Sequence, residues 1–564
     1  MEALDWLVIG VFFLALIGII VWVVRQKQND SADYFLGGRD ATWLAIGASI
    51  FASNIGSEHL IGLAGAGASS GMAMAHWEIQ GWMILILGWV FVPFYTRSMV
   101  YTMPEFLERR YNPQSRTILS VISLVSYVLT KVAVTVYAGG LVFQQVFGIK
   151  ELWGIDFFWI AAIGLVVLTA LYTIFGGMKS VLYTSVLQTP ILLLGSLIIL
   201  VLGFKELGGW DEMMRVCGAV TVNDYGDTMT NLIRSNDDAN FPWLGALIGS
   251  AIIGFWYWCT DQFIVQRVLS GKNEKEARRG TIFGAYLKLL PVFLFLIPGM
   301  IAFALHQKYI GAGGEGFLPM LANGTANADA AFPTLVAKLL PAGVKGLVVC
   351  GILAALMSSL ASLFNSSAML FTIDFYKRFR PETPEKKLVG IGQIATVVIV
   401  ILGILWIPIM RSVGDVLYTY LQDVQSVLAP GIAAAFLLGI CWKRTSAQGG
   451  MWGLIAGMII GLTRLGAKVY YSNAGEVADS TFKYLFYDMN WLFFCGWMFL
   501  FCIIVVIVVS LATEAPTAEK IQGLVFGTAT KEQKAATRAS WDHWDIIHTV
   551  IILAITGAFY WYFW

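Results

Sequence analysis

Long apolar runs recur along almost the whole chain and are separated by shorter polar connections. A helix of about 20 predominantly apolar residues is long enough to cross the ~30 Å hydrocarbon core of a bilayer. Segments of this kind occupy residues 6–24, 43–65, 77–95, 118–146, 157–174, 181–201, 243–268, 284–305, 346–375, 389–409, 413–440, 449–465, 491–511 and 546–563. The pattern predicts an all-α polytopic membrane protein with about 14 transmembrane helices.

The basic residues are divided unevenly between the two sets of alternate connections. About 24 of the 37 Lys and Arg residues fall in one set and about 11 in the other. Because short cytoplasmic loops carry the excess of positive charge, the first set is predicted to be cytoplasmic and both termini to be outside. Two long connections, 204–242 and 306–345, then lie on the outer side, and neither shows strong periodicity.

Two of the apolar segments are interrupted by polar residues. Residues 53–59 (SNIGSEH) divide segment 43–65, and Gly254 together with residues 260–262 (TDQ) divides segment 243–268. Interrupted membrane helices persist where they line a cavity, and they typically hold a solute or ion near the midplane; the alternative is close helix packing through small residues. The two segments are five spans apart, which predicts opposite orientations and an inverted five-helix repeat.

Two lysines lie inside predicted spans. A lysine at the centre of a membrane helix costs roughly 2.5–3.5 kcal/mol, so Lys131 and Lys288 should face the protein interior and have a partner. Glu78 and Asp261 are candidate partners. A structural ion pair and a polar binding site are both compatible with this pattern.

Hydroxyl and amide side chains add two further candidates. Ser358, Ser362 and Ser366 recur at a spacing of four on one helical face, with Ser359 beside it. They suit either close helix packing or a desolvated Na⁺, which requires several oxygen ligands. Gln422 lies within a span and can both donate to and accept from a sugar hydroxyl.

Composition excludes several classes of function. The chain is 58% hydrophobic and 13% charged with a net charge of +1, so neither a soluble domain nor a nucleic-acid-binding protein is indicated. The six cysteines form no CxxC pair and indicate no disulfide framework or zinc site. Phosphate-binding, nucleophile-elbow and zinc-protease motifs are absent, and no enzyme is predicted.

Four stretches together resemble the solute/sodium symporter family, and in particular its sodium/glucose (sodium/galactose) cotransporters. They are GGRDATWLAIGASIFASNIGSEHLIGLAGAGASSG from Gly37, WYWCTDQFIVQRVLSGKN from Trp256, YLKLLP from Tyr286 and ALMSSLASLFNSSAMLFTIDFYKRF from Ala355. The resemblance implies a LeuT-type five-plus-five inverted repeat with two discontinuous helices. The implied divisions are an extra N-terminal helix and cytoplasmic loop (1–40), a first repeat (41–203), an outer loop (204–242), an inverted second repeat (243–440) and additional C-terminal helices (441–564).

The resemblance also implies three groups of site residues. The sugar-binding group is Asn54, His59, Glu78, Tyr257, Trp258, Lys288 and Gln422. The outer lid is Leu63, Trp77 and Tyr418. The Na⁺ ligands are the carbonyls of Ala52, Ile55 and Ala355 and the hydroxyls of Ser358 and Ser359.

The chain departs from the family pattern in ways that affect coupling and origin. Ser185 stands where an acid is common, and Ala361 stands where two-sodium members have a hydroxyl, so one Na⁺ per solute is expected. The long insertion before the last span in animal members is absent, which favours a bacterial inner membrane as the plasma membrane concerned.

The sequence therefore predicts Na⁺-coupled symport of a neutral hexose of the glucose or galactose type into the cell by alternating access. The expected partners are a small sugar, Na⁺ and the lipid bilayer. A carboxylate beside the implied site, Glu78, disfavours an anionic solute. A symporter for another neutral solute such as myo-inositol, and a sugar sensor or leak channel on the same fold, remain as alternatives.

Overall fold

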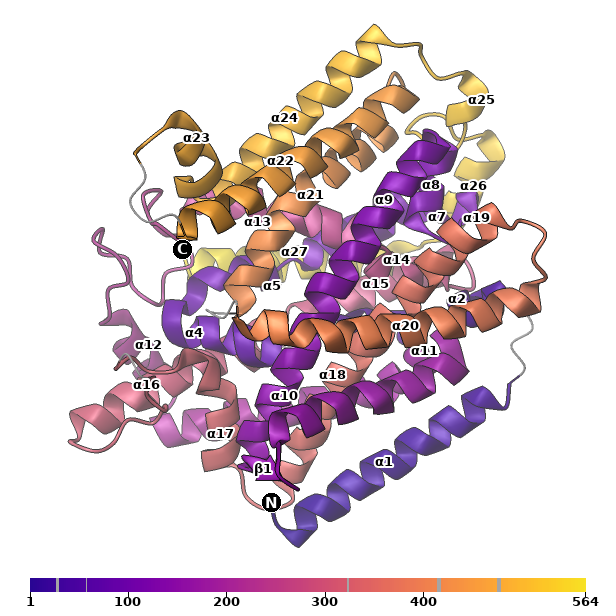
Figure 1. Cartoon of the computed structure of the whole chain (residues 1–564). Coiled ribbons are helices and arrows are strands. Elements are labelled where there is room, and N and C mark those ends of the chain that lie inside the picture. Colours follow the sequence, from indigo (N-terminus) through magenta and orange to yellow (C-terminus); the bar gives the residue numbers. More distant parts are fainter. Residues whose placement is uncertain (27–29, 57, 322–323, 413–416, 474–477) are drawn as a thin grey trace.

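The computed structural model describes residues 1–26, 30–56, 58–321, 324–412, 417–473 and 478–564, with side chains excepted at 128–130, 133, 145, 406–412, 417–421 and 472–473. It is a helical bundle whose described strands are one antiparallel pair, β1 (Glu151–Leu152) and β2 (Ile155–Asp156) (Figure 1). Within the described ranges, 11 helices are long and apolar enough to cross a membrane.

The first half of the chain contains α1 (Ala3–Val24), α2 (Ser31–Leu36), α3 (Trp43–Asn54), α4 (Ala64–Ser70), α5 (Ala75–Glu78), α6 (Gly81–Ile86), α7 (Val92–Ser98), α8 (Met103–Arg110), α9 (Pro113–Ser126), α10 (Ala133–Phe147), α11 (Phe157–Leu207) and α12 (Trp210–Gly218). The second half contains α13 (Trp243–Gly254), α14 (Gln262–Leu269), α15 (Glu274–Lys288), α16 (Ile297–Gly311), α17 (Ala331–Leu339), α18 (Val344–Met369), α19 (Lys377–Phe379), α20 (Glu385–Ser412), α21 (Leu417–Cys441), α22 (Ala447–Asn473), α23 (Thr481–Lys483), α24 (Trp491–Ala512), α25 (Ala518–Ile521), α26 (Lys531–Ala539) and α27 (His543–Tyr562). Short π-helical segments join several of them, among them η2 (Glu58–Leu63), η5 (Tyr127–Val132), η6 (Phe255–Thr260), η7 (Val292–Leu296) and η9 (Leu370–Tyr376).

The helix α11 accounts for part of the difference from the predicted number of spans. At 1.5 Å per residue, its 51 residues would extend about 77 Å if straight, which is more than twice the bilayer core. Gly177 interrupts it with φ 53° and ψ −147°, a conformation suited to glycine. A Cβ at this position would also lie 2.4 Å from the carbonyl oxygen of Tyr34. The element thus contains the two predicted segments 157–174 and 181–201.

Both predicted helix interruptions are present. The helix α3 ends at Asn54, Ile55 is extended (φ −79°, ψ 103°), and the chain continues through η2 into α4. The helix α13 ends at Gly254 and passes through η6 to an extended Asp261 (φ −76°, ψ 127°), whose side chain caps α14. The inverted relation of the two five-helix units stays a prediction, as do the five divisions of the chain.

The helix α18 lies in the core of the bundle. It packs against α11, α3, α1 and α20, and 89% of its most apolar window is buried, compared with 22% for α1. Figure 1 shows α1 along one edge of the bundle and α22 beside α24 at the opposite edge. The residues of α18 are therefore the ones best isolated from lipid and water.

The long connections contain more order than the sequence indicates. Part of 204–242 forms α12, and part of 306–345 forms α17. In α12, Met213 and Cys217 are fully buried, and the Cys217 thiol lies 3.7 Å from the carbonyl oxygen of Met300 in α16. The absence of strong periodicity was misleading because these helices have only about two turns and are stabilised by tertiary contacts.

Small residues bring α4 and α16 into backbone contact. A Cβ on Gly299 would lie 1.9 Å from the carbonyl oxygen of Ala64, and one on Gly67 would lie 2.2 Å from that of Leu296. Neither carbonyl can move without shifting its helix. This contact therefore fixes the second half of the first broken helix.

We expect Gly299→Ala to lower thermal stability, because overpacking of this kind typically costs about 1–3 kcal/mol. The measurement is the midpoint of thermal unfolding in detergent. Gly311→Ala is the matched control, since it lies in the same helix and a Cβ there meets nothing within 4 Å. Equal midpoints for the two variants would contradict the packing argument.

Candidate functional site

A polar cavity lies between the two broken helices. The residues known to line it are Asn54, Glu58, His59, Trp77, Glu78, Gln80, Lys131, Val134, Thr135, Ile253, Gly254, Tyr257, Trp258, Phe263, Lys288, Ser359, Leu363, Gln422 and Gln425. All seven residues of the predicted sugar-binding group are among them.

Irregular backbone places these side chains at the cavity. Asn54 is the last residue of α3, and Tyr257 and Trp258 lie in the π-helical segment η6. Lys288 is the last residue of α15, because Pro291 follows closely and disfavours helix in the residue before it. At a helix end, backbone groups are exposed and side chains can point into the cavity. In a continuous helix, the same side chains would point toward neighbouring helices.

A buried network of polar contacts links five of the predicted residues. The Lys288 ammonium lies 2.6 Å from a carboxylate oxygen of Glu78 and donates to the amide oxygen of Asn54 at 3.2 Å. The Asn54 amide in turn donates to the Tyr257 hydroxyl at 3.1 Å. His59 Nε2 lies 3.3 Å from the same oxygen of Glu78.

The second buried lysine also has an acidic partner. Lys131 Nζ lies 2.5 Å from a carboxylate oxygen of Asp261 at the break of the second broken helix. It also lies 4.8 Å from the ring centroid of Tyr257 and 5.3 Å from that of Trp256. The expectation that both lysines are paired with Glu78 or Asp261 is confirmed, and the structure shows which pairs with which.

Two polar groups at the cavity are buried without a hydrogen-bond partner in the part of the chain that the structure describes. They are the indole N–H of Trp77, a donor, and the amide oxygen Oε1 of Gln422, an acceptor. Burying such a group unpaired costs about 1–3 kcal/mol. Both are therefore available to a ligand that can accept one hydrogen bond and donate another.

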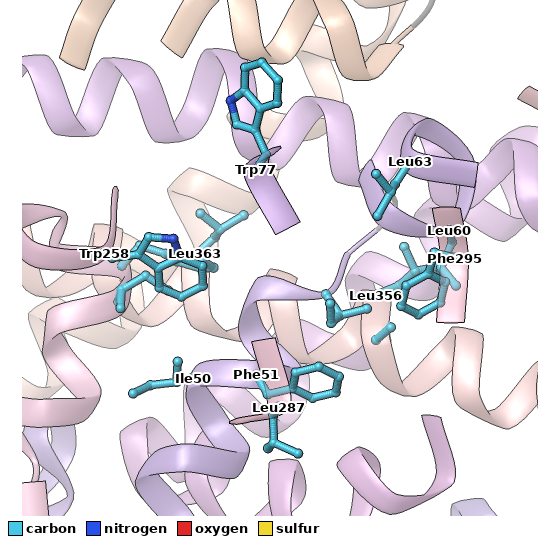
Figure 2. Packing of buried hydrophobic residues seen from close by; sticks show 14 of the residues in the cluster. Ile50, Phe51, Leu60, Leu63, Trp77, Trp258, Leu287, Phe295, Leu356 and Leu363 are labelled. Atoms are coloured by element: carbon cyan, nitrogen blue, oxygen red, sulfur yellow. The ribbon is translucent and has the colours of Figure 1, made fainter. Parts of the chain in front are cut away.

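The two predicted lid residues whose side chains are described, Leu63 and Trp77, lie apart. The Trp77 ring stacks on Trp491 of α24 at 5.5 Å with an interplanar angle of 23°, and the edge of Phe241 lies 6.2 Å away. Leu63 is fully buried and is not among the described residues that line the cavity; Figure 2 shows it near Leu60 and apart from Trp77. The Tyr418 side chain lies outside the described residues.

The predicted sodium residues fall where α3 ends against α18. The Ser359 hydroxyl donates to the carbonyl oxygen of Ser53 at 2.8 Å and to that of Ile55 at 3.1 Å. The Ser358 hydroxyl lies 3.3 Å from that of Ser185 in α11. Because Ile55 is extended, its carbonyl is turned out of the helical pattern and toward α18.

The remaining two predicted ligands are on the same two helices. Ala52 lies in the last turn of α3, and Ala355 lies one turn before Ser359 in α18. Each is at most 2% exposed. The five residues thus come from the two helices that meet beside the cavity, which Ser359 also lines.

Sequence reasoning assigned no role to several cavity residues. Gln80, Thr135 and Gln425 line the cavity and are buried, and the half-buried Glu58 beside His59 also lines it. Gln425 lies in the same predicted span as Gln422, three residues later. Because this spacing places both side chains on one helical face, it was a usable signal that they share the cavity. Nothing in the sequence distinguishes Thr135 from a hydroxyl packed inside a helix.

Sequence comparisons relate the chain to known proteins. A sequence model of the Sodium:solute symporter family matches residues 34–457. Sodium/myo-inositol cotransporter 2 of Mus musculus is 37% identical over 542 residues, covering 94% of this chain and 80% of its own length. Sodium/glucose cotransporter 4 of Danio rerio is 35% identical over 560 residues, covering 96% and 84%.

A solved structure of a Na⁺-coupled sialic acid symporter, described as a substrate-bound outward-open state, superposes with a TM-score of 0.72 at 22% identity. The match covers 92% of this chain and 99% of that one, and it establishes a common fold. The family match and the relatives extend over most of the chain and agree with one another. The chain therefore belongs to the sodium:solute symporter family and is a Na⁺-coupled transporter of a solute, not an enzyme.

Proposed function

We propose that the solute is a neutral polyol of the hexose class, carried into the cell with Na⁺ by alternating access. The observation that carries this proposal is the balance of polar groups at the cavity. Two carboxylates, Glu58 and Glu78, and two ammoniums, Lys131 and Lys288, line it. An ionic solute would find no excess of the opposite charge.

Hydrogen-bonding capacity supports the same class of solute. Each hydroxyl of a polyol both donates and accepts, so it needs a mixed set of partners when buried. The unpaired indole N–H of Trp77 and the unpaired amide oxygen of Gln422 supply one of each kind. Asn54 and His59 add groups that can act in either direction.

Aromatic rings supply the apolar contact that a pyranose face requires. Tyr257 and Trp258 lie edge to face at 4.9 Å and both line the cavity. The hydrogen bond between Tyr257 and Asn54 ties the two broken helices together. In this proposal Tyr257 stacks on the inner side of the sugar, and release inward requires that bond to break.

We further propose that Na⁺ binds between α3 and α18, held by the five residues named for it above. The support is the convergence of the Ser359 hydroxyl with backbone carbonyls freed by the helix break. The ion would bridge the broken helix to the most buried helix. We also propose that the protein lies in the plasma membrane, which in bacteria is the inner membrane. Both termini are proposed to be outside the cytoplasm.

The relatives include myo-inositol and glucose cotransporters, so the decisive experiment compares these solutes. Purified protein in proteoliposomes should take up labelled glucose, galactose or myo-inositol when an inward Na⁺ gradient is imposed, and not with K⁺. If the protein prefers myo-inositol, the proposed solute is a cyclic polyol of similar hydroxyl content and not a hexose. Na⁺ binding without uptake of any polyol would overturn the proposal, and equal uptake without a gradient would identify a leak channel.

We expect one Na⁺ to accompany each solute. The described oxygen ligands converge at one place, and Ser185 and Ala361 offer no carboxylate or hydroxyl pair for a second ion; Ser185 already lies against Ser358. Uptake should then depend on Na⁺ with a Hill coefficient near one. The reversal potential of solute-coupled current measures the ratio directly, and a value that fits two charges per solute would contradict it.

A further inference from the structure

Gln80 joins three elements at the wall of the cavity. It lies in the short break between α5 and α6, is 3% exposed and lines the cavity. Its amide Nε2 donates to the carbonyl oxygen of Ser250 in α13 at 2.8 Å. Its Oε1 accepts from the indole N–H of Trp258 at 3.3 Å. One side chain therefore fixes the orientation of a ring that faces the solute.

The amide of Gln80 occupies the space beside a glycine. Gly254 is the last residue of α13, and a Cβ there would lie 2.5 Å from Oε1 of Gln80 and 2.8 Å from its Cδ. Both residues line the cavity. The glutamine can lie in this position only because Gly254 has no side chain.

The amide also has capacity left for a ligand. A primary amide has two N–H donors and two acceptor lone pairs. The bonds to Ser250 and Trp258 use one N–H and one lone pair. The other N–H and the other lone pair of Gln80 have no partner among the described residues. Both are on an amide that lines the cavity.

We propose that Gln80, seated on Gly254, is a specificity-determining residue of the transporter. This inference rests on the proposed function, since it concerns which polyols the cavity accepts. The amide limits the size of the solute at this wall and holds the Trp258 ring in one orientation. Hexoses with a substituent larger than a hydroxyl are rejected because the amide occupies the space they need.

The test compares uptake of unsubstituted glucose with that of N-acetylglucosamine and methyl glucoside in proteoliposomes. In Gln80→Ala the ratio of kcat/KM for glucose to that for the substituted sugars should fall at least about tenfold, because a missing methylene group alone changes discrimination by about 10–200-fold. Gln80→Asn keeps an amide but shortens the side chain, so it should change the ratio less. It replaces the alanine variant in the test if that variant folds poorly. Gln393→Ala is the control, because its amide also donates to a backbone carbonyl, that of Ile174, but it is not among the cavity-lining residues.

A double variant tests the pairing itself. Gly254→Ala should weaken glucose uptake about tenfold by displacing the amide, and this loss should largely disappear in the Gln80→Ala background, where no amide remains to clash. Additive losses, or an unchanged solute ratio in Gln80→Ala with active wild-type protein, would overturn this inference alone. A wild-type protein that transports no polyol would overturn the proposed function and this inference with it.

Discussion

Glu78→Gln should reduce Na⁺-driven solute uptake at least a hundredfold. The substitution keeps the shape of the side chain but leaves the Lys288 ammonium buried without its counter-charge. Breaking a buried ion pair in this way costs about 3–5 kcal/mol, and the 2.6 Å contact between the two groups shows that they are directly paired. The same carboxylate lies 3.3 Å from His59, so its loss also releases a second cavity residue.

The measurement is initial uptake of the preferred polyol in proteoliposomes, with Na⁺ binding and thermal unfolding followed in parallel. Na⁺ binding should be largely retained, because Glu78 is not among the five proposed ligands. Glu212→Gln is the control, since it removes a carboxylate from an exposed pair with Arg215, and such pairs contribute little. If Glu78→Gln lost uptake, Na⁺ binding and folded protein together, the residue would only stabilise the bundle.

Ser359→Ala should raise the half-saturating Na⁺ concentration by about tenfold or more while the fold persists. A hydrogen bond or ligand contact involving a charged group contributes about 1.5–3 kcal/mol. The Ser359 hydroxyl already lies within 3.1 Å of the Ile55 carbonyl freed by the helix break. Its removal therefore takes one oxygen from the proposed ion site without disturbing the apolar packing of α18.

The dependence of uptake on Na⁺ concentration measures this effect. Ser367→Ala is a matched control, because Ser367 is a fully buried serine of the same helix whose hydroxyl has no hydrogen-bond partner in the described part of the chain. That variant should leave Na⁺ dependence unchanged. An unaltered Na⁺ dependence in Ser359→Ala would show that the serines of α18 serve helix packing.

Local chemistry explains which parts of the fold were predictable. Polar residues inside an apolar run, at residues 53–59 and 260–262, located both helix breaks. An unpaired backbone group in hydrocarbon is too costly to persist unless it lines a cavity or is buried in protein. The presence of acidic partners for the buried lysines followed from the same argument. Which acid pairs with which lysine depends on how distant segments pack, and no spacing in the sequence encodes it.

The roles of other residues could not be predicted, because they too depend on how distant segments pack. Gln80 lies near the start of the predicted span 77–95, where a polar side chain is expected near the membrane surface; the break between α5 and α6 instead places it at the cavity. Leu63 was placed in the lid by resemblance; it is fully buried and is not among the described residues that line the cavity, and its role stays a prediction. Trp491 begins an apolar segment, where tryptophan usually marks the membrane interface, and its contact with Trp77 joins two segments that are far apart in the sequence.

The stacking of Trp77 on Trp491 connects the cavity wall to a part of the protein outside the segment that the family model matches. That segment ends at residue 457, and α24 begins at Trp491. Only 33% of the most apolar window of α24 is buried, so most of this helix faces the surrounding lipid. Trp77 lines the cavity, so a change in the tilt of α24 would move the Trp491 ring against a side chain of the cavity wall, and it would also shift the contacts of α24 with α13, α21 and α22.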